Sequence, residues 1–265
     1  MSQIIKSRSL IVYMFLFCLF AGCSGEGNNI QRFGQLRLVE PSEIEHFEGM
    51  REAISIKVLD ELSKANIRNY SLFLKDLGDS AISVFCYFEY TGADFHAEMS
   101  ALRKNPIIQQ WERGSEETPI RGILPGSEND QWKNMEEVFN YEGSSTLPGD
   151  VDIQPYGMVI GLRPEFIDSY KLLHQYAWPE VLDAIDKGNI RNYSIYLHEI
   201  EGNHYLFSYF EYTGINFDAD MSLIDSDPAT IAWMKFTDRV CQLPIPTRSE
   251  GEWWARMKEL LNTPD

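Results

Sequence analysis

The chain has little positive charge and few cysteines. Of its 265 residues, 23 are lysine or arginine and 40 are aspartate or glutamate, which gives a formal net charge of -17. Such an acidic surface repels phosphates, so nucleic acids and sugar phosphates are excluded as expected partners and a neutral ligand is favoured. The four cysteines lack metal-ligand spacing and are too few for a disulfide framework. The sequence also lacks a P-loop, a Rossmann glycine pattern and a nucleophile elbow.

The first 23 residues have the pattern of an export signal. Lys6 and Arg8 form a positive segment, a mostly apolar run covers residues 10–20, and two small residues precede Cys23. The apolar run is too short for a permanent membrane-spanning helix, which needs about 20 residues. The sequence around Cys23 resembles the lipobox of bacterial lipoproteins. The resemblance implies lipidation at Cys23 and a protein anchored at the cell envelope on its periplasmic side. A plain secretory peptide cleaved nearby is the alternative.

The rest of the chain is one unit written twice. The six residues from Asn66 to Ser71 return unchanged at 189–194, and those from Tyr87 to Gly92 return at 209–214. The whole of each copy aligns with the other at nearly constant spacing. The expected organisation is a signal segment (1–23), a tether (24–30), a first repeat (31–142), a loop-like linker (143–154) and a second repeat (155–262).

Each repeat has the pattern of an α+β unit. In the second repeat, residues 156–162, 192–197 and 205–212 read as strands, and helices open at Pro164, Pro179 and Asp227-Pro228. The last segment, residues 252–261, favours helix by propensity, whereas its counterpart at 132–141 reads equally well as strand. The order β-α-β-β-α-β predicts a ferredoxin-like unit with one face of its sheet uncovered. Two such units predict an intrachain pseudo-dimeric α+β barrel. Further association between chains stays open.

Aromatic side chains and one histidine gather in the second repeat. Tyr170 and His174 are four residues apart and share one helix face. Trp178 lies at the helix break, Tyr193 begins a strand, and Trp233 lies on a later helix. Aromatic faces with a few polar groups suit a small neutral monosaccharide. The competing interpretation is that the aromatic residues form core and the histidine is structural.

The segments that carry this pattern are Pro164-Glu165, Tyr170, His174, Trp178-Pro179-Glu180, Asn192–Leu197, and Trp233 with Lys235. They resemble the L-rhamnose mutarotase family, and the first repeat resembles it more faintly. That family interconverts the α and β anomers of a deoxy-sugar without cofactor or metal. The resemblance implies that His174 is catalytic, that Tyr170 and Tyr193 bind substrate, and that the last segment is a strand. The tandem tryptophans of the family's pocket correspond here to Trp233-Met234.

An ordinary histidine pKa near 6.5 suits proton transfer at neutral pH. We therefore expect His174 to be the principal acid, with Tyr170 and Tyr193 holding sugar hydroxyls and, as further catalytic residues, available to relay the second proton. Trp178, Trp233 and Met234 would line the substrate site.

In the first repeat, Phe47 and Arg51 replace Tyr170 and His174, and an arginine cannot shuttle protons at neutral pH. One active site per chain is expected, in the second repeat. A sugar-binding lipoprotein without turnover and a purely structural barrel are the competing hypotheses.

Overall fold

The computed structural model describes residues 30–78, 81–113, 131–143 and 151–263. The export signal and Cys23 lie outside the described residues. The first repeat contains β1 (Gln31–Val39), η1 (Pro41–Glu43), α1 (Ile44–Ala53), α2 (Ile56–Lys64), β2 (Ile67–Asp76), β3 (Ile82–Tyr90), α3 (Phe95–Arg103), α4 (Pro106–Arg113), β4 (Lys133–Asn134) and β5 (Glu136–Tyr141). The second contains β6 (Gln154–Leu162), η2 (Pro164–Phe166), α5 (Ile167–Gln175), α6 (Pro179–Lys187), β7 (Ile190–Ile200), β8 (Asn203–Tyr212), α7 (Phe217–Ser226), α8 (Pro228–Cys241), β9 (Gln242–Leu243), β10 (Ala255–Arg256) and β11 (Lys258–Asn262).

Each sheet takes its last strand from the other repeat. One sheet has the order β11-β2-β3-β1-β4, and the other has β10-β6-β8-β7-β5 with β9 paired to β6. Thus β11 of the second repeat pairs with β2 of the first, and β5 of the first repeat pairs with β7 of the second. The final segment is therefore a strand, because a free sheet edge offers it backbone partners that outweigh its helix propensity. The exchange ties the two repeats into one body.

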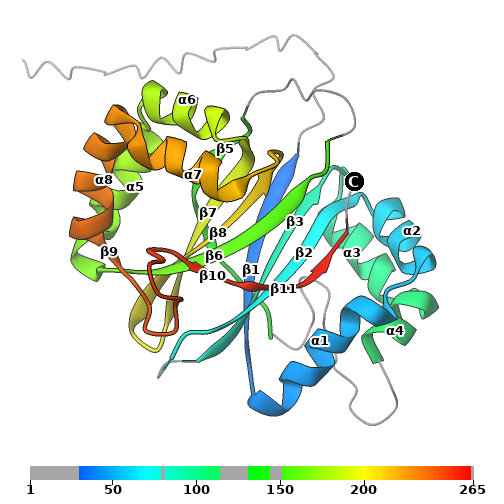
Figure 1. The fold of residues 1–265 in the computed structure, drawn as a ribbon. Coiled ribbons are helices and arrows are strands. Elements are labelled where there is room, and N and C mark those ends of the chain that lie inside the picture. Colours follow the sequence, from blue (N-terminus) through cyan, green and yellow to red (C-terminus); the bar gives the residue numbers. More distant parts are fainter. Residues whose placement is uncertain (1–29, 79–80, 114–130, 144–150, 264–265) are drawn as a thin grey trace, which may run out of the picture.

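The two sheets pack face to face, with the helices outside. Helices α1–α4 flank one side of the molecule and α5–α8 the other, with the sheets between them (Figure 1). Aromatic residues fill the space between the sheets, including Phe73, Phe85, Tyr196 and Phe207. The predicted α+β architecture, with two ferredoxin-like units forming a pseudo-dimeric barrel, is confirmed. Among the described residues, no helix combines the length and apolarity that a membrane crossing requires.

Two glycines allow the sheets to approach closely. The Cα of Gly34 on β1 lies against the Tyr196 ring of the other sheet, and Gly157 on β6 lies in the same way against Phe73. A Cβ at either glycine would overlap the facing ring. Gly34 and Gly157 occupy equivalent places in the two repeats, as do Phe73 and Tyr196. The contact is therefore made twice, once on each side of the pseudo-twofold axis.

The first repeated motif encodes a backbone irregularity. Asn66, Asn69, Asn189 and Asn192 all have φ between 47° and 57°. Asparagine tolerates this left-handed conformation better than other non-glycine residues. The pairing of β2 with β3 shifts register between Arg68 and Ser71, and β7 shifts against β8 at the equivalent place. The motif is thus kept in both repeats for its bulge.

Both repeated motifs also supply a buried polar network between the sheets. Asn192 Nδ2 donates to Glu89 Oε1 at 2.7 Å and to Glu211 Oε1 at 2.9 Å, and Asn69 Nδ2 donates to Glu211 Oε1 at 3.1 Å. The rings of Tyr87 and Tyr209 stack with centroids 3.7 Å apart, and each hydroxyl donates to the glutamate two residues on. The most strongly repeated residues therefore hold the two repeats together.

Candidate active site

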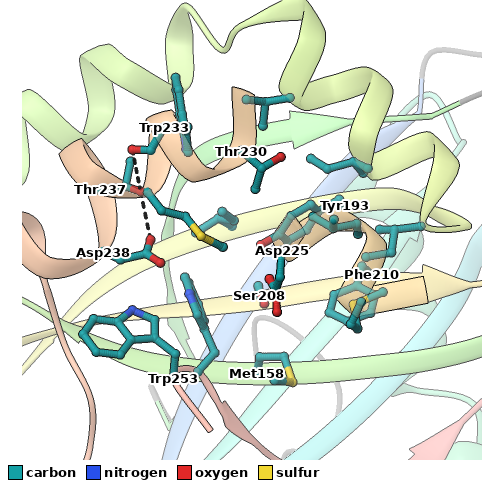
Figure 2. A pocket seen from close by; sticks show the side chains of 18 of the residues that line it. Met158, Tyr193, Ser208, Phe210, Asp225, Thr230, Trp233, Thr237, Asp238 and Trp253 are labelled. Carbon is teal, nitrogen blue, oxygen red and sulfur yellow. Dashed lines mark hydrogen bonds between the residues drawn. The ribbon is translucent and has the colours of Figure 1, made fainter. Parts of the chain in front are cut away.

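A cavity of about 600 Å³ lies in the second repeat, between the outer face of its sheet and helices α5–α8 (Figure 2). This volume is within the range of small-molecule sites. Strands β6, β7 and β8 form its floor, and residues 251–256 contribute at one side. Helix α8 is fixed at its start by Asp227, whose carboxylate accepts hydrogen bonds from the backbone N–H groups of Ala229 and Thr230.

The imidazole of His174 lines this cavity inside an aromatic cage. Its ring stacks on Tyr170 at 4.0 Å between centroids and meets Phe139 and Trp233 edge-on, each at 5.5 Å. His174 Nδ1 lies 2.9 Å from the Tyr170 carbonyl oxygen. A carbonyl only accepts, so Nδ1 carries the proton and Nε2 of the neutral ring holds a lone pair.

Burial keeps His174 neutral. Desolvation lowers the pKa of His174 to about 4, and the hydrogen bond to the Tyr170 carbonyl opposes the shift only partly. The imidazole is therefore neutral at pH 7, and its Nδ1 proton is committed to the backbone. The expectation of an ordinary pKa near 6.5 is wrong, because the sequence does not show how completely the ring is enclosed. A neutral ring fits proton acceptance at Nε2, whereas the sequence suggested an acid.

Tyr170 and Tyr193 both line the cavity and interact with each other. Desolvation raises the pKa of both phenols, so both stay protonated and can donate hydrogen bonds. The Gln242 side chain hydrogen-bonds to the Tyr170 phenol, and Gln242 Oε1 accepts a bond from Trp253 Nε1 at 2.7 Å. The structure thus brings Tyr193, from β7, to the same cavity as Tyr170 and His174, which share one helix.

The sequence predicted none of the four carboxyl groups that line the cavity, which belong to Asp218, Asp225, Asp238 and Glu252. Asp225 at the end of α7 and Asp238 on α8 both line it (Figure 2). Desolvation raises the pKa of both groups, and Asp225 raises that of Asp238 further. Asp238 follows Met234 by four residues on one helix, a spacing that could have identified it. Asp225 offers no such signal, and in a strongly acidic chain neither carboxylate stands out.

Two of the three residues expected to line the substrate site do so, and Trp178 does not. Trp233 and Met234 line the cavity, together with Trp253 and Trp254. Trp178 is not among the lining residues; it packs edge-on against Trp233 with centroids 5.4 Å apart. Trp178 therefore supports a wall. Across residues 30–78, 81–113, 131–143 and 151–263, no three His, Cys, Asp or Glu side chains group closely enough to hold a metal ion.

The corresponding region of the first repeat is filled with side chains. Three polar residues of the cavity, Tyr170, Ser208 and Thr230, have less polar counterparts there that are packed into one hydrophobic cluster. Phe47 and Tyr70 are fully buried, whereas Tyr193 keeps partial exposure. The members Phe47, Tyr70, Cys86, Ile108 and Trp111 occupy the places of Tyr170, Tyr193, Ser208, Thr230 and Trp233. The first repeat therefore lacks the phenol of Tyr170 and the hydroxyls of Ser208 and Thr230 that line the cavity of the second.

Solved structures similar to this chain are remote in sequence. A putative monooxygenase from Fusobacterium nucleatum is 12% identical, with 89% of this chain and 97% of that chain covered and a TM-score of 0.46. One from Lactobacillus acidophilus is 5% identical, with 88% and 96% covered and a TM-score of 0.48. A mutant chlorite dismutase from Candidatus Nitrospira defluvii is 13% identical, with 86% and 91% covered and a TM-score of 0.32.

No curated protein sequence matches the chain significantly. The family model described as L-rhamnose mutarotase, by contrast, matches twice, over residues 32–141 and over residues 155–262. The two matches follow the tandem duplication and together cover most of the sequence. The chain therefore belongs to the L-rhamnose mutarotase family, a family of carbohydrate isomerases that interconvert sugar anomers.

Proposed function

We propose that this protein interconverts the α and β anomers of a neutral deoxy-sugar similar to L-rhamnose, at one site in the second repeat. The observation that carries the proposal is the meeting of Tyr170, His174 and Tyr193 around one cavity walled by tryptophans. Indole faces can stack on the C–H faces of a pyranose, while phenols and carboxylates can bind its hydroxyls. Both repeats match the family, so the match does not show which of them holds the site. The second repeat is chosen because side chains fill the corresponding region of the first.

In the proposed reaction His174 acts first as a base. Its Nε2 takes the proton of the anomeric hydroxyl while the ring oxygen receives a proton and the bond from C1 to that oxygen breaks. The open-chain aldehyde rotates about C1–C2, and the hydroxyl closes on the other face of the carbonyl. General acid–base help of this kind typically contributes about 10²–10⁴-fold to the rate. Tyr170 and Tyr193, protonated throughout, orient the sugar by hydrogen bonds.

Exchange NMR on L-rhamnose and related deoxy-sugars tests the proposal. When the signal of one anomeric proton is saturated, the saturation should transfer to the signal of the other anomer faster with the protein than in buffer alone. His174→Ala should reduce the excess rate by at least about 10²-fold. Tyr193→Phe should slow it, and the matched variant Tyr70→Phe in the filled repeat should not. Equal rates for wild type, His174→Ala and buffer would refute the proposed activity.

Sugar binding without exchange is the competing outcome. The second wall residue, Met234, gives a thioether where the family has a second indole, so the shape of this wall differs from the family pattern. Calorimetry would separate the two functions. Measurable binding of a deoxy-sugar by wild type, with exchange no faster than in buffer, would assign the cavity to a binding lipoprotein.

We further propose that the protein is lipid-anchored at Cys23, on the periplasmic side of the cell envelope. The proposal rests on the signal pattern of residues 1–23 alone. Wild type should partition with membranes, and Cys23→Ser should be released. Unchanged membrane partition of Cys23→Ser would remove the lipid anchor without touching the sugar chemistry.

A further inference from the structure

The proposed mutarotation needs a proton donor that His174 does not supply, and the inference that follows rests on that proposed function. The neutral imidazole can take the anomeric proton at Nε2, and its Nδ1 proton is held by the Tyr170 carbonyl. The ring oxygen must receive a proton from a different group as its bond to C1 breaks. A second titratable side chain on the cavity is therefore required.

The tyrosines are poor candidates for that donor. Burial raises the pKa of Tyr170 and of Tyr193 far above neutrality, so each holds its proton tightly. Four carboxyl groups also line the cavity, and that of Glu252 accepts hydrogen bonds from the backbone N–H groups of Ser249 and Arg256. Asp218 and Asp225 are exposed and Asp238 is half-buried, although desolvation raises the pKa of both Asp225 and Asp238. The choice therefore lies between Asp225 and Asp238.

Asp238 has the better position. Its charge raises the pKa of both phenols, Tyr170 and Tyr193, so Asp238 lies near the two groups that would orient the sugar. The charge of Asp225 has no such effect on either phenol. Asp238 Oδ1 lies 2.9 Å from the Thr237 hydroxyl, which can donate to it and fix the carboxyl group. Asp238 follows the wall residue Met234 by four residues on α8, so the two share a helix face, and both line the cavity.

We propose that Asp238 is the catalytic acid that works with His174, delivering its proton to the ring oxygen while His174 takes the anomeric proton. After ring opening the pair holds an imidazolium and a carboxylate. On closure the carboxylate takes the proton from the attacking hydroxyl, and the imidazolium returns its proton to the carbonyl oxygen. Both groups regain their starting states, as a reaction that runs equally in both directions requires.

The surroundings bring the proton affinities of the pair together. The pKa of His174 is lowered by desolvation, and the pKa of Asp238 is raised by desolvation and by the charge of Asp225. The neighbouring Arg239 on the same helix opposes this rise of the Asp238 pKa, as does the Thr237 hydroxyl. Asp238 also acts on Tyr170 from α5, Tyr193 from β7 and Cys241 on its own helix, all protonated at neutral pH, and Glu252 lines the same cavity. Arg256 from β10 also lines the cavity.

The test is the pH dependence of anomer exchange in full-length wild type, Asp238→Asn, Asp238→Glu and Asp225→Asn. Wild type should lose activity about tenfold per pH unit above the pKa of the acid. Asp238→Asn should lower kcat by about 10²-fold with little change in KM and leave a residual rate without that alkaline loss. Asp238→Glu should restore most of kcat. Asp225→Asn should move the alkaline loss to lower pH, because removing its charge lowers the pKa of Asp238.

The outcomes separate this inference from the proposed function. No exchange by wild type with any deoxy-sugar at any pH would remove the mutarotase proposal itself. Exchange by wild type together with an undiminished rate and unchanged pH profile in Asp238→Asn would overturn only the role of Asp238. Near-ultraviolet circular dichroism checks that each variant is folded. Should Asp238→Asn fail to fold, an alkaline limb that stays in place in Asp225→Asn would overturn the inference instead.

Discussion

Replacing Asn192 by alanine perturbs the buried network between the sheets, and Asn69 provides a matched control. Asn192 makes two hydrogen bonds to carboxylates from Nδ2; its Oδ1 accepts from Arg32 Nε at 3.2 Å and lies 3.0 Å from the Tyr87 hydroxyl. Asn69, its counterpart in the first repeat, donates to Glu211 and, among the described residues, has no bond to Glu89. Both residues have nearly the same positive φ, 47° and 50°. The backbone cost of alanine is therefore common to both variants.

The expected loss of unfolding free energy follows from the hydrogen bonds that each variant removes. A hydrogen bond to a charged group contributes about 1.5–3 kcal/mol, and an alanine in the left-handed region costs about 1 kcal/mol. Asn69→Ala should then lower the free energy of unfolding by about 2.5 kcal/mol. Asn192→Ala should lower it by about 4 kcal/mol or more, since it loses a second bond to a carboxylate and leaves Glu89 without that donor.

Urea unfolding followed by tryptophan fluorescence measures the difference. The two sheets exchange strands, so one cooperative transition is expected for the whole molecule, and the midpoints can be compared directly. A gap of about 1.5 kcal/mol corresponds to slightly more than a tenfold change in the unfolding equilibrium constant. Equal destabilisation by the two variants would refute the reasoning, because it would mean that the backbone conformation alone determines the cost.

Three further outcomes are expected. Gly157→Ala should destabilise the fold by about 1–3 kcal/mol, because the added Cβ meets the Phe73 ring. In the double variant, Phe73→Leu should recover part of this loss. Thermal unfolding measures the stability of both variants. The pKa of His174 is about 4 when folded and near 6.5 when unfolded, so the unfolded chain binds more protons between these values. The stability from the neutral imidazole should be complete above pH 6.5 and fall by up to about 3 kcal/mol as pH drops to 4, a slope that His174→Asn should lack in urea titrations. Trp253→Ala should raise KM for the sugar several-fold and leave kcat nearly unchanged, because the indole lines the cavity and its Nε1 donates a hydrogen bond to Gln242. Steady-state exchange rates measure both constants. A fall in kcat would mean that Trp253 takes part in proton transfer.

The duplication could be read from the sequence because the repeated motifs are short and local. Each asparagine at positive φ, and each Tyr-x-Glu on the neighbouring strand, is needed in both repeats to build the same bulge and the same contact. Helix starts were likewise predictable, since proline at a first turn and aspartate at an N-cap act within a few residues. Local physics is sufficient for these features.

The sequence by itself determined the repeat, the α+β class and the identity of the Tyr170, His174 and Tyr193 set. Only the tertiary structure decided which sheet each final strand joins, because that depends on a free edge in the other repeat. It also decided that His174 is neutral, that Trp178 stands behind Trp233, and that Asp225 and Asp238 share the cavity. Proton affinity and cavity lining depend on what surrounds a side chain in space, and neighbours from distant segments leave no mark in the spacing of residues.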